Sequence, residues 1–257
     1  MKQQRPFTFG RRPGQHRTSL ELKSNAMLRA LIYLLFAALP FVAAGQKCAE
    51  MYDYFKVGAT LEYTHYDKRD KVVSVMTQRV TQVEEVKDTL TATFEITTVD
   101  DKGKNETKST VPMKCIEGVI YMDMRSIIPP AQDNEQAPDI QMEMKGTDLT
   151  FPSTMEPGQT LPDAEMQLIM RTGGMQLMNM RYLIKNRKVE AKETATTKAG
   201  EFASTKISYD FEYKLLGTRS NRTEAWFSPA VGTVKSVSYD KNGKVESRME
   251  LTKYIKG

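Results

Sequence analysis

Apolar and polar residues alternate along most of the chain after residue 57, and a period of two predicts β-strands. In residues 89–97, Leu90, Ala92, Phe94 and Ile96 share one face, while threonines and one glutamate occupy the other. Residues 203–215 repeat the pattern with aromatic and aliphatic residues on one face and charged residues on the other. Such segments are typical of antiparallel strands with one buried and one solvated face.

Turn signals separate the alternating segments. Residues 100–103 end in Lys-Gly and residues 240–243 end in Asn-Gly, and both pairs supply the positive φ that tight hairpins require. The other predicted strands are residues 60–66, 72–83, 118–124, 140–149, 178–190, 231–239 and 245–254. The chain is therefore predicted to be all-β, with about ten mostly antiparallel strands. Residues 129–138 and 152–162 are predicted loops, and residues 164–178 could form one modest helix.

The N-terminal part has a different pattern, because residues 30–44 form an uncharged and almost wholly apolar run behind Arg29. The run is about fifteen residues long, and a membrane-spanning helix needs roughly twenty, so we expect an export signal and no permanent transmembrane anchor. Small residues favour cleavage after Ala44 or Gly45. Residues 1–45 are therefore predicted to be an N-terminal extension with a cleaved signal peptide, and translation could start at Met1 or at Met27. Residues 46–257 are predicted to form one β-rich domain.

The signal region also accounts for the basic balance of the chain. The whole sequence has 37 basic and 32 acidic residues, a net charge of +5. Seven basic residues and one acidic residue precede Gln46, so the remainder holds 30 basic and 31 acidic residues and a net charge of −1. A basic patch for nucleic acid is therefore not expected.

Cys48 and Cys115 are the only cysteines, and export would carry them to a compartment where disulfides persist. A bridge between them is the simplest reading, and two buried free thiols are the alternative. Lipidation of Cys48 is disfavoured, because Gln46 and Lys47 stand where a lipoprotein signal requires a small residue.

Catalytic patterns are absent from the sequence. It contains no zinc-protease, nucleophile-elbow, Cys-x-x-Cys, P-loop or dinucleotide pattern, and His65 is the only histidine after the signal region. His65 shares a predicted strand face with Leu61 and Tyr63, so we expect a half-buried imidazole. A pair of carboxylates could still form a hydrolase site without a linear signature. The prediction is a protein that is not an enzyme and needs no cofactor.

Methionine is unusually frequent, with eleven of the sixteen between Met113 and Met180. Three Met-x-Met pairs each place two thioethers on one strand face. The pairs are Met122 with Met124, Met142 with Met144, and Met178 with Met180. Thioethers bind Cu(I) and Ag(I), so these six residues are candidate soft-metal ligands. The stronger expectation is that they fill an irregular core or line an adaptable apolar cavity.

The C-terminal part carries a family resemblance. Residues 198–202 read Lys-Ala-Gly-Glu-Phe, Lys206-Ile207 follows, and residues 226–235 read Trp-Phe-Ser-Pro-Ala-Val-Gly-Thr-Val-Lys. These motifs resemble the TapB-like family of exported bacterial proteins, a domain-of-unknown-function group. The resemblance covers roughly residues 58–257 and implies a β-rich fold in the bacterial envelope, either a curved open sheet or a half-closed barrel. The export signal predicts a periplasmic or extracellular location. It supplies no catalytic residues.

Three functional hypotheses follow. The first is a non-enzymatic envelope protein whose curved sheet binds an apolar molecule or a lipid-modified partner, and it predicts an apolar cavity of several hundred Å³. The second is an assembly factor that pairs with another envelope protein through an exposed sheet edge. The third is a Cu(I)-binding protein, which requires the three methionine pairs to converge.

Overall fold

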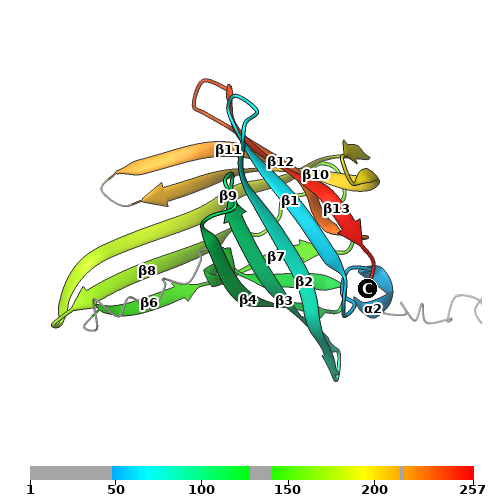
Figure 1. The fold of residues 1–257 in the computed structure, drawn as a ribbon, viewed down its shortest axis with the longest axis horizontal. Coiled ribbons are helices and arrows are strands. Elements are labelled where there is room, and N and C mark those ends of the chain that lie inside the picture. Colours follow the sequence, from blue (N-terminus) through cyan, green and yellow to red (C-terminus); the bar gives the residue numbers. More distant parts are fainter. Residues whose placement is uncertain (1–47, 128–139, 215–216) are drawn as a thin grey trace, which may run out of the picture. The chain divides into compact units, whose positions relative to one another are not determined.

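Thirteen antiparallel strands form one continuous sheet in the computed structural model of the protein (Figure 1). The structure describes residues 48–127, 140–214 and 217–257, all within one compact unit. The elements are α2 (Cys48–Met51), β1 (Thr60–Asp67), β2 (Val72–Val86), β3 (Thr89–Asp100), β4 (Glu106–Ile116), β5 (Val119–Asp123), the 3-10 helix η1 (Met124–Ile127), β6 (Ile140–Gly146), β7 (Asp148–Pro152), β8 (Ala164–Thr172), β9 (Met175–Thr197), β10 (Gly200–Lys214), β11 (Thr218–Ser228), β12 (Gly232–Tyr239) and β13 (Val245–Ile255). Neither helix in these ranges has the length and apolar character that a membrane crossing demands.

The predicted all-β fold is confirmed, although the sheet has more strands than the approximate ten. Two of the additional strands, β4 and β11, have only one half that alternates clearly. In β11 the residues before Thr223 are polar on both faces, whereas Ala225 and Phe227 are buried. Alternation over so few residues does not stand out in a sequence.

The helix predicted over residues 164–178 is wrong. This segment forms β8, a turn and the start of β9, and the two strands pair with each other. Ala164, Met166 and Leu168 repeat with a period of two, and all three are buried. Gly173 and Gly174 both have positive φ, 53° and 80°, and they make the turn that a helix could not contain.

The predicted strand at residues 140–149 is two strands with different partners. β6 pairs with β8, β7 pairs with β5, and only Thr147 separates them. The sheet order is β6-β8-β9-β10-β11-β12-β13-β1-β2-β3-β4-β5-β7, so its two edge strands are consecutive in the chain. Gly146 allows the close approach of the two strands just before this change of partner. A Cβ there would lie 2.8 Å from the carbonyl oxygen of Glu165, which is too close for any other residue without a shift of the backbone. The chain thereby joins the two edges of the sheet, which curves into a nearly closed barrel without hydrogen bonds between β6 and β7 in the described residues.

Aromatic side chains fill the interior near α2. Tyr54 and Phe55 pack edge to face, with ring centroids 4.9 Å apart, and Phe55 also packs on Phe94 of β3. Tyr52 joins the same cluster, and all four side chains are almost wholly buried. We call residues 48–59 together with Phe94 the aromatic end of the barrel.

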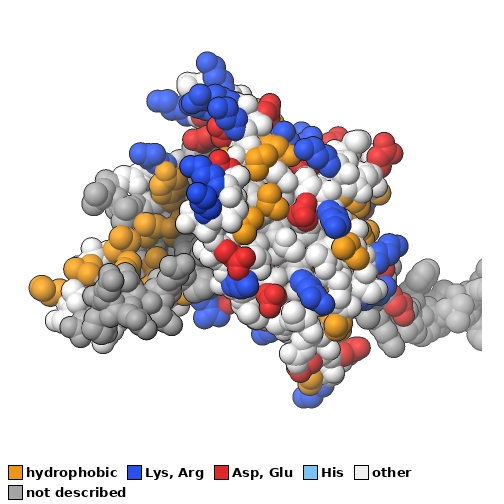
Figure 2. All heavy atoms as spheres, in the orientation of Figure 1, with side chains coloured by type: hydrophobic (Ala, Val, Ile, Leu, Met, Phe, Trp, Pro, Cys, Tyr) orange, Lys and Arg blue, Asp and Glu red, His pale blue; other side chains and the backbone are white. Residues whose placement is uncertain are grey.

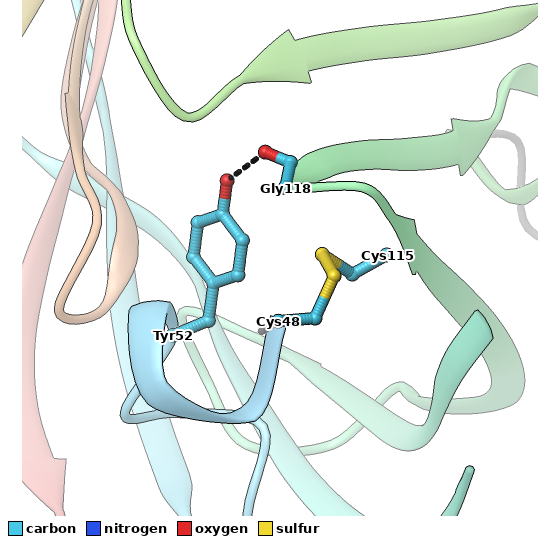
Figure 3. Close-up of a disulfide and its surroundings, with 4 residues drawn as sticks. All are labelled: Cys48, Tyr52, Cys115 and Gly118. Atoms are coloured by element: carbon cyan, nitrogen blue, oxygen red, sulfur yellow. Dashed lines mark hydrogen bonds between the residues drawn. A yellow bond between two sulfur atoms is a disulfide. The ribbon is translucent and has the colours of Figure 1, made fainter. Parts of the chain in front are cut away.

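A disulfide fastens α2 to the sheet at this aromatic end (Figure 3). It joins Cys48 to Cys115 of β4, the pairing expected from the sequence, with their Cα atoms 5.9 Å apart. Beside it, the Tyr52 hydroxyl donates a hydrogen bond of 2.9 Å to the carbonyl oxygen of Gly118. The predicted loop at residues 129–138 and the predicted signal region lie outside the described residues.

Candidate functional site: the barrel cavity

A cavity of about 740 Å³ lies inside the barrel. Most of its wall is apolar. The apolar side chains come from strands that are far apart in the sheet, and they include Met76, Ile96, Met113, Ile120, Leu149 and Met249. The prediction of an apolar cavity of several hundred Å³ is therefore confirmed. Its volume falls within the range of ordinary small-molecule sites.

The alternation of the strands explains why the wall is apolar. On β10 and β11, Ile207, Tyr209, Ala225 and Phe227 face the cavity. Trp226 lies between two of these residues and faces outward, where the ammonium groups of two lysines lie 5.1 Å from its ring centroid. The period of two thus puts apolar groups inside the barrel and charged groups outside.

Two phenylalanines meet inside the barrel from strands that are not neighbours. Phe151 of β7 and Phe227 of β11 are stacked, with centroids 4.8 Å apart and ring planes within 8° of each other. Both rings also line the cavity. They lie at the side of the cavity formed by β7, one of the two edge strands of the sheet.

Among the described residues of the cavity wall, Arg187 of β9 is the one charged residue that is almost completely buried. It is only 1% exposed. Its Nη1 donates to the carbonyl oxygen of Pro162 and its Nη2 to that of Thr150, both at 2.7 Å. Its guanidinium carbon lies 5.2 Å from the ring centroid of Phe151. The side chain therefore links β9 to Thr150 of β7 and to Pro162 in the segment before β8.

Burial decides the electrostatics of this arginine. Loss of solvation lowers the pKa of Arg187 to about 10, while Tyr209 and Asp163 act in the opposite direction. The guanidinium remains protonated at neutral pH. Within the described ranges, no carboxylate forms an ion pair or a hydrogen bond with it.

A β-bulge turns Arg187 inward. Asn186 has a positive φ of 55°, and the register with β10 shifts between Ser208 and Asp210. Ile184 faces the cavity before the bulge, and Arg187 faces it after the bulge. Strict alternation would have put Arg187 on the outer face with Lys185, because the bulge inserts one residue.

Three tyrosines add polar groups to the cavity wall: Tyr54, Tyr63 and Tyr209. Burial raises the pKa of each phenol, so all three stay neutral at physiological pH. The positive charge of Arg187 acts on the pKa of Tyr209 in the opposite direction, and both residues line the cavity. The buried part of the wall thus offers neutral hydroxyl groups and one cation.

The cavity reaches solvent beside β4. Thr107 and Lys108 line it and are exposed. The Lys108 side chain is 65% exposed, and its ammonium lies 2.9 Å from a carboxylate oxygen of Glu106. The second cation of the wall is therefore hydrated and already paired.

The six candidate methionine ligands fall into separate groups. Met122 of β5 lines the cavity, and Met124 is buried in η1, which contacts β6 and β8. The other four are Met142 and Met144 on β6 and Met178 and Met180 on β9, on either side of β8. In this register Met170 of β8 lies opposite both Met142 and Met178.

We call β6, β8 and the part of β9 before Tyr182 the methionine arm. Two strand spacings separate its outer strands, about 9.5 Å. Met142 is 40% exposed, Met175 and Leu177 are more exposed still, and hydrophobic side chains gather on this part of the surface (Figure 2). Met180 accepts a hydrogen bond from the Tyr182 hydroxyl through its sulfur. In the described ranges, no group of three or more His, Cys, Asp or Glu residues could hold a metal ion.

Comparison with known proteins places this barrel in a family. The DUF3108-like family description matches residues 56–251, which is most of the chain. The chain belongs to the DUF3108-like family. A search of curated proteins finds no match.

Two solved structures share the fold of this DUF3108-like chain. One, from Bacteroides fragilis, is described as an exported protein with a YmcC-like fold; it is 20% identical, with a TM-score of 0.63, over 78% of this chain and 97% of its own. The other, from Parabacteroides distasonis, is described as a lipoprotein; it is 20% identical, with a TM-score of 0.62, over 79% of this chain and 99% of its own. At this identity the likeness extends to the fold alone.

Proposed function

We propose that the protein is a non-enzymatic binding protein of the cell envelope that holds an apolar molecule, or the acyl chain of a lipid-modified partner, inside its barrel. The observation that carries this proposal is the apolar cavity of about 740 Å³. A core of this chain length normally packs at the density of an organic crystal, with few voids larger than a water molecule. A cavity of this size, lined by flexible methionines as well as aromatic rings, favours a bound molecule.

The envelope location rests on two supports. Residues 30–44 have the length and composition of an export signal. The two similar structures are described as an exported protein and a lipoprotein. The finer resemblance to the TapB-like family is part of this proposal, within the broader DUF3108-like family.

The test is to fill the cavity. Ala225→Phe would place a ring in the space beside Ile207, whereas Ala230→Phe makes the same change in an exposed turn. The measurement is the fluorescence of N-phenylnaphthylamine, a neutral apolar probe, titrated with each purified protein. We expect wild type and Ala230→Phe to bind the probe and Ala225→Phe to bind it at least tenfold more weakly. Equal binding by the two variants would contradict the proposal, provided both have wild-type circular dichroism spectra.

A second candidate function is supported by the row formed by Met142, Met170 and Met178 across three paired strands. Three thioethers from adjacent strands could bind Cu(I) or Ag(I). Isothermal titration with Ag(I) tests this idea. Saturable binding that Met170→Leu abolishes would support the metal site, and no saturable heat would reject it.

The assembly hypothesis would use β6, which among the described residues is hydrogen-bonded on one side only, to β8. Its exposed Met142 adds apolar surface beside that edge. A photocrosslinker at Gln141, compared with one at the exposed Lys241 of the β12–β13 turn, tests it in intact cells. A specific crosslinked protein at Gln141 alone would favour edge pairing.

A further inference from the structure

We infer that the molecule held in the barrel is an anionic amphiphile, and that the Arg187 guanidinium contacts its carboxylate or phosphate headgroup. This inference rests on the proposed function. It goes further in naming the chemical class of the ligand, the orientation of the ligand and the residue that recognises it.

The first argument is the cost of a buried charge. Removing a cation from water costs several kcal/mol, and proteins normally compensate it with a carboxylate. Arg187 is 1% exposed, and no described carboxylate pairs with it. Two backbone carbonyls and one aromatic ring satisfy part of its hydrogen bonding, and the charge of Asp163 acts on it without forming an ion pair. A ligand anion would supply a countercharge in direct contact with the guanidinium.

The second argument is the supply of donors. A guanidinium has five N–H groups in a planar fork that matches carboxylate and phosphate oxygens. Arg187 uses two of them on the carbonyls of Thr150 and Pro162, and no other hydrogen bond engages the group among the described residues. The carbonyls and the Phe151 ring hold the fork in place, so an anion would meet a donor that is already ordered.

The third argument is the contrast between the two cations of the wall. Lys108 is solvated and lies 2.9 Å from Glu106, so its charge is largely screened and neutralised. Arg187 is buried, with the hydroxyl-bearing Tyr209 near it on the same wall. The headgroup therefore goes to Arg187, and the chain occupies the apolar space toward β2 and β3.

The test compares ligands that differ only in their headgroup. Hexadecanoate, hexadecyl phosphate, hexadecanol and hexadecyltrimethylammonium are used to displace N-phenylnaphthylamine from the full-length exported protein, below their micellar concentrations. Charged hydrogen bonds in a dry site change affinity by about tenfold to a hundredfold. We expect the two anions to compete at least tenfold better than the alcohol, and the cation to compete worst. Inorganic phosphate, which has no chain, should displace nothing.

Substitutions then assign the preference to one residue. Arg187→Met should abolish the preference for anions, and Arg187→Lys, which keeps a positive charge but not the planar fork of donors, should reduce it. Lys188→Met removes the exposed neighbouring charge on the outer face of β9, and Lys108→Met removes the paired cation. Lys188→Met is the control and should retain the wild-type preference. Lys108→Met asks whether the other cation of the wall holds the headgroup, and it should retain the preference as well.

The outcomes separate this inference from the function on which it rests. Equal competition by hexadecanoate and hexadecanol in wild type would overturn the anionic headgroup and leave the apolar carrier intact. A preference that is lost in Lys108→Met, or that is kept in a folded Arg187→Met, would overturn the assignment to Arg187. Failure of wild type to bind the probe and every chain would overturn the proposed function itself.

Discussion

The aromatic end and the methionine arm are built from opposite kinds of side chain. At the aromatic end, Tyr52, Phe55 and Phe94 are rigid, edge-packed and almost wholly buried, and a disulfide holds the covering segment in place. On the methionine arm, unbranched thioethers lie on three paired strands, and Met142 remains 40% exposed. The cavity extends from the aromatic end, where Tyr54 lines it, into the barrel.

The difference shows how one sheet can be both stable and adaptable. Aromatic rings bury a large area with few rotatable bonds, so they fix one arrangement. Methionine has three rotatable bonds beyond its backbone and fills gaps of changing shape. We therefore expect the aromatic end to carry most of the folding free energy and the methionine arm to tolerate substitution.

The largest expected effect comes from truncating the centre of the aromatic end. Phe94 is 0% exposed, and Phe94→Ala should lower the free energy of unfolding by about 3–5 kcal/mol, through lost burial and the cavity left behind. Met142→Ala on the arm is the matched control and should cost less than about 1 kcal/mol. Urea denaturation of both variants measures this difference. Similar losses in the two variants would invalidate the comparison.

Removing the disulfide should have the next largest effect. Cys48 and Cys115 are 67 residues apart, so the chain-entropy model gives the bridge about 4 kcal/mol, and measured values are usually smaller. We expect the Cys48→Ser/Cys115→Ser double variant to lose about 2–4 kcal/mol in the same denaturation assay. Probe binding in the cavity should survive at low temperature, because the bridge lies outside the cavity wall. A double variant as stable as wild type would show that the aromatic packing alone holds the segment.

A single hydrogen bond at the aromatic end should matter less. Tyr52→Phe keeps the ring but leaves the Gly118 carbonyl without its buried donor, and should cost about 1–2 kcal/mol. Tyr121→Phe is a control on β5, where the tyrosine is only half-buried. Thermal unfolding followed by circular dichroism measures both variants. An unchanged midpoint for Tyr52→Phe would mean that water replaces the lost donor.

The smallest effect concerns His65, near the end of β1 remote from α2. Burial lowers the pKa of His65 below its usual 6.5, so near pH 6 the unfolded chain binds more protons than the folded one. Stability should therefore decrease as the pH falls below about 6.5, where the imidazole of the unfolded chain takes up a proton more readily than that of the folded chain. His65→Gln should flatten this part of the stability curve. An identical slope in both proteins would show that His65 contributes nothing to it.

Alternation determined much of the fold in advance. The pattern in residues 89–97 and 203–215 is strong because each of these strands has one buried face, and β3 and β10 lie there. The cysteine count and the predicted export signal favoured a bridge between Cys48 and Cys115, and the structure contains this bridge. The helix at residues 164–178 was wrong because its methionines suit either structure, and only the glycine turn and the pairing with β9 settle it.

The tertiary structure alone decided the site. No local pattern says that residues 140–149 change partners at Thr147, because strand pairing depends on contacts distant in sequence. Arg187 lies between Lys185 and Lys188, and such a cluster of cations predicts an exposed strand face. The one extra residue of the bulge at Asn186 instead directs the Arg187 side chain toward the cavity. The period of two determines which faces are apolar, whereas the closure of the sheet and one bulge determine what those faces enclose.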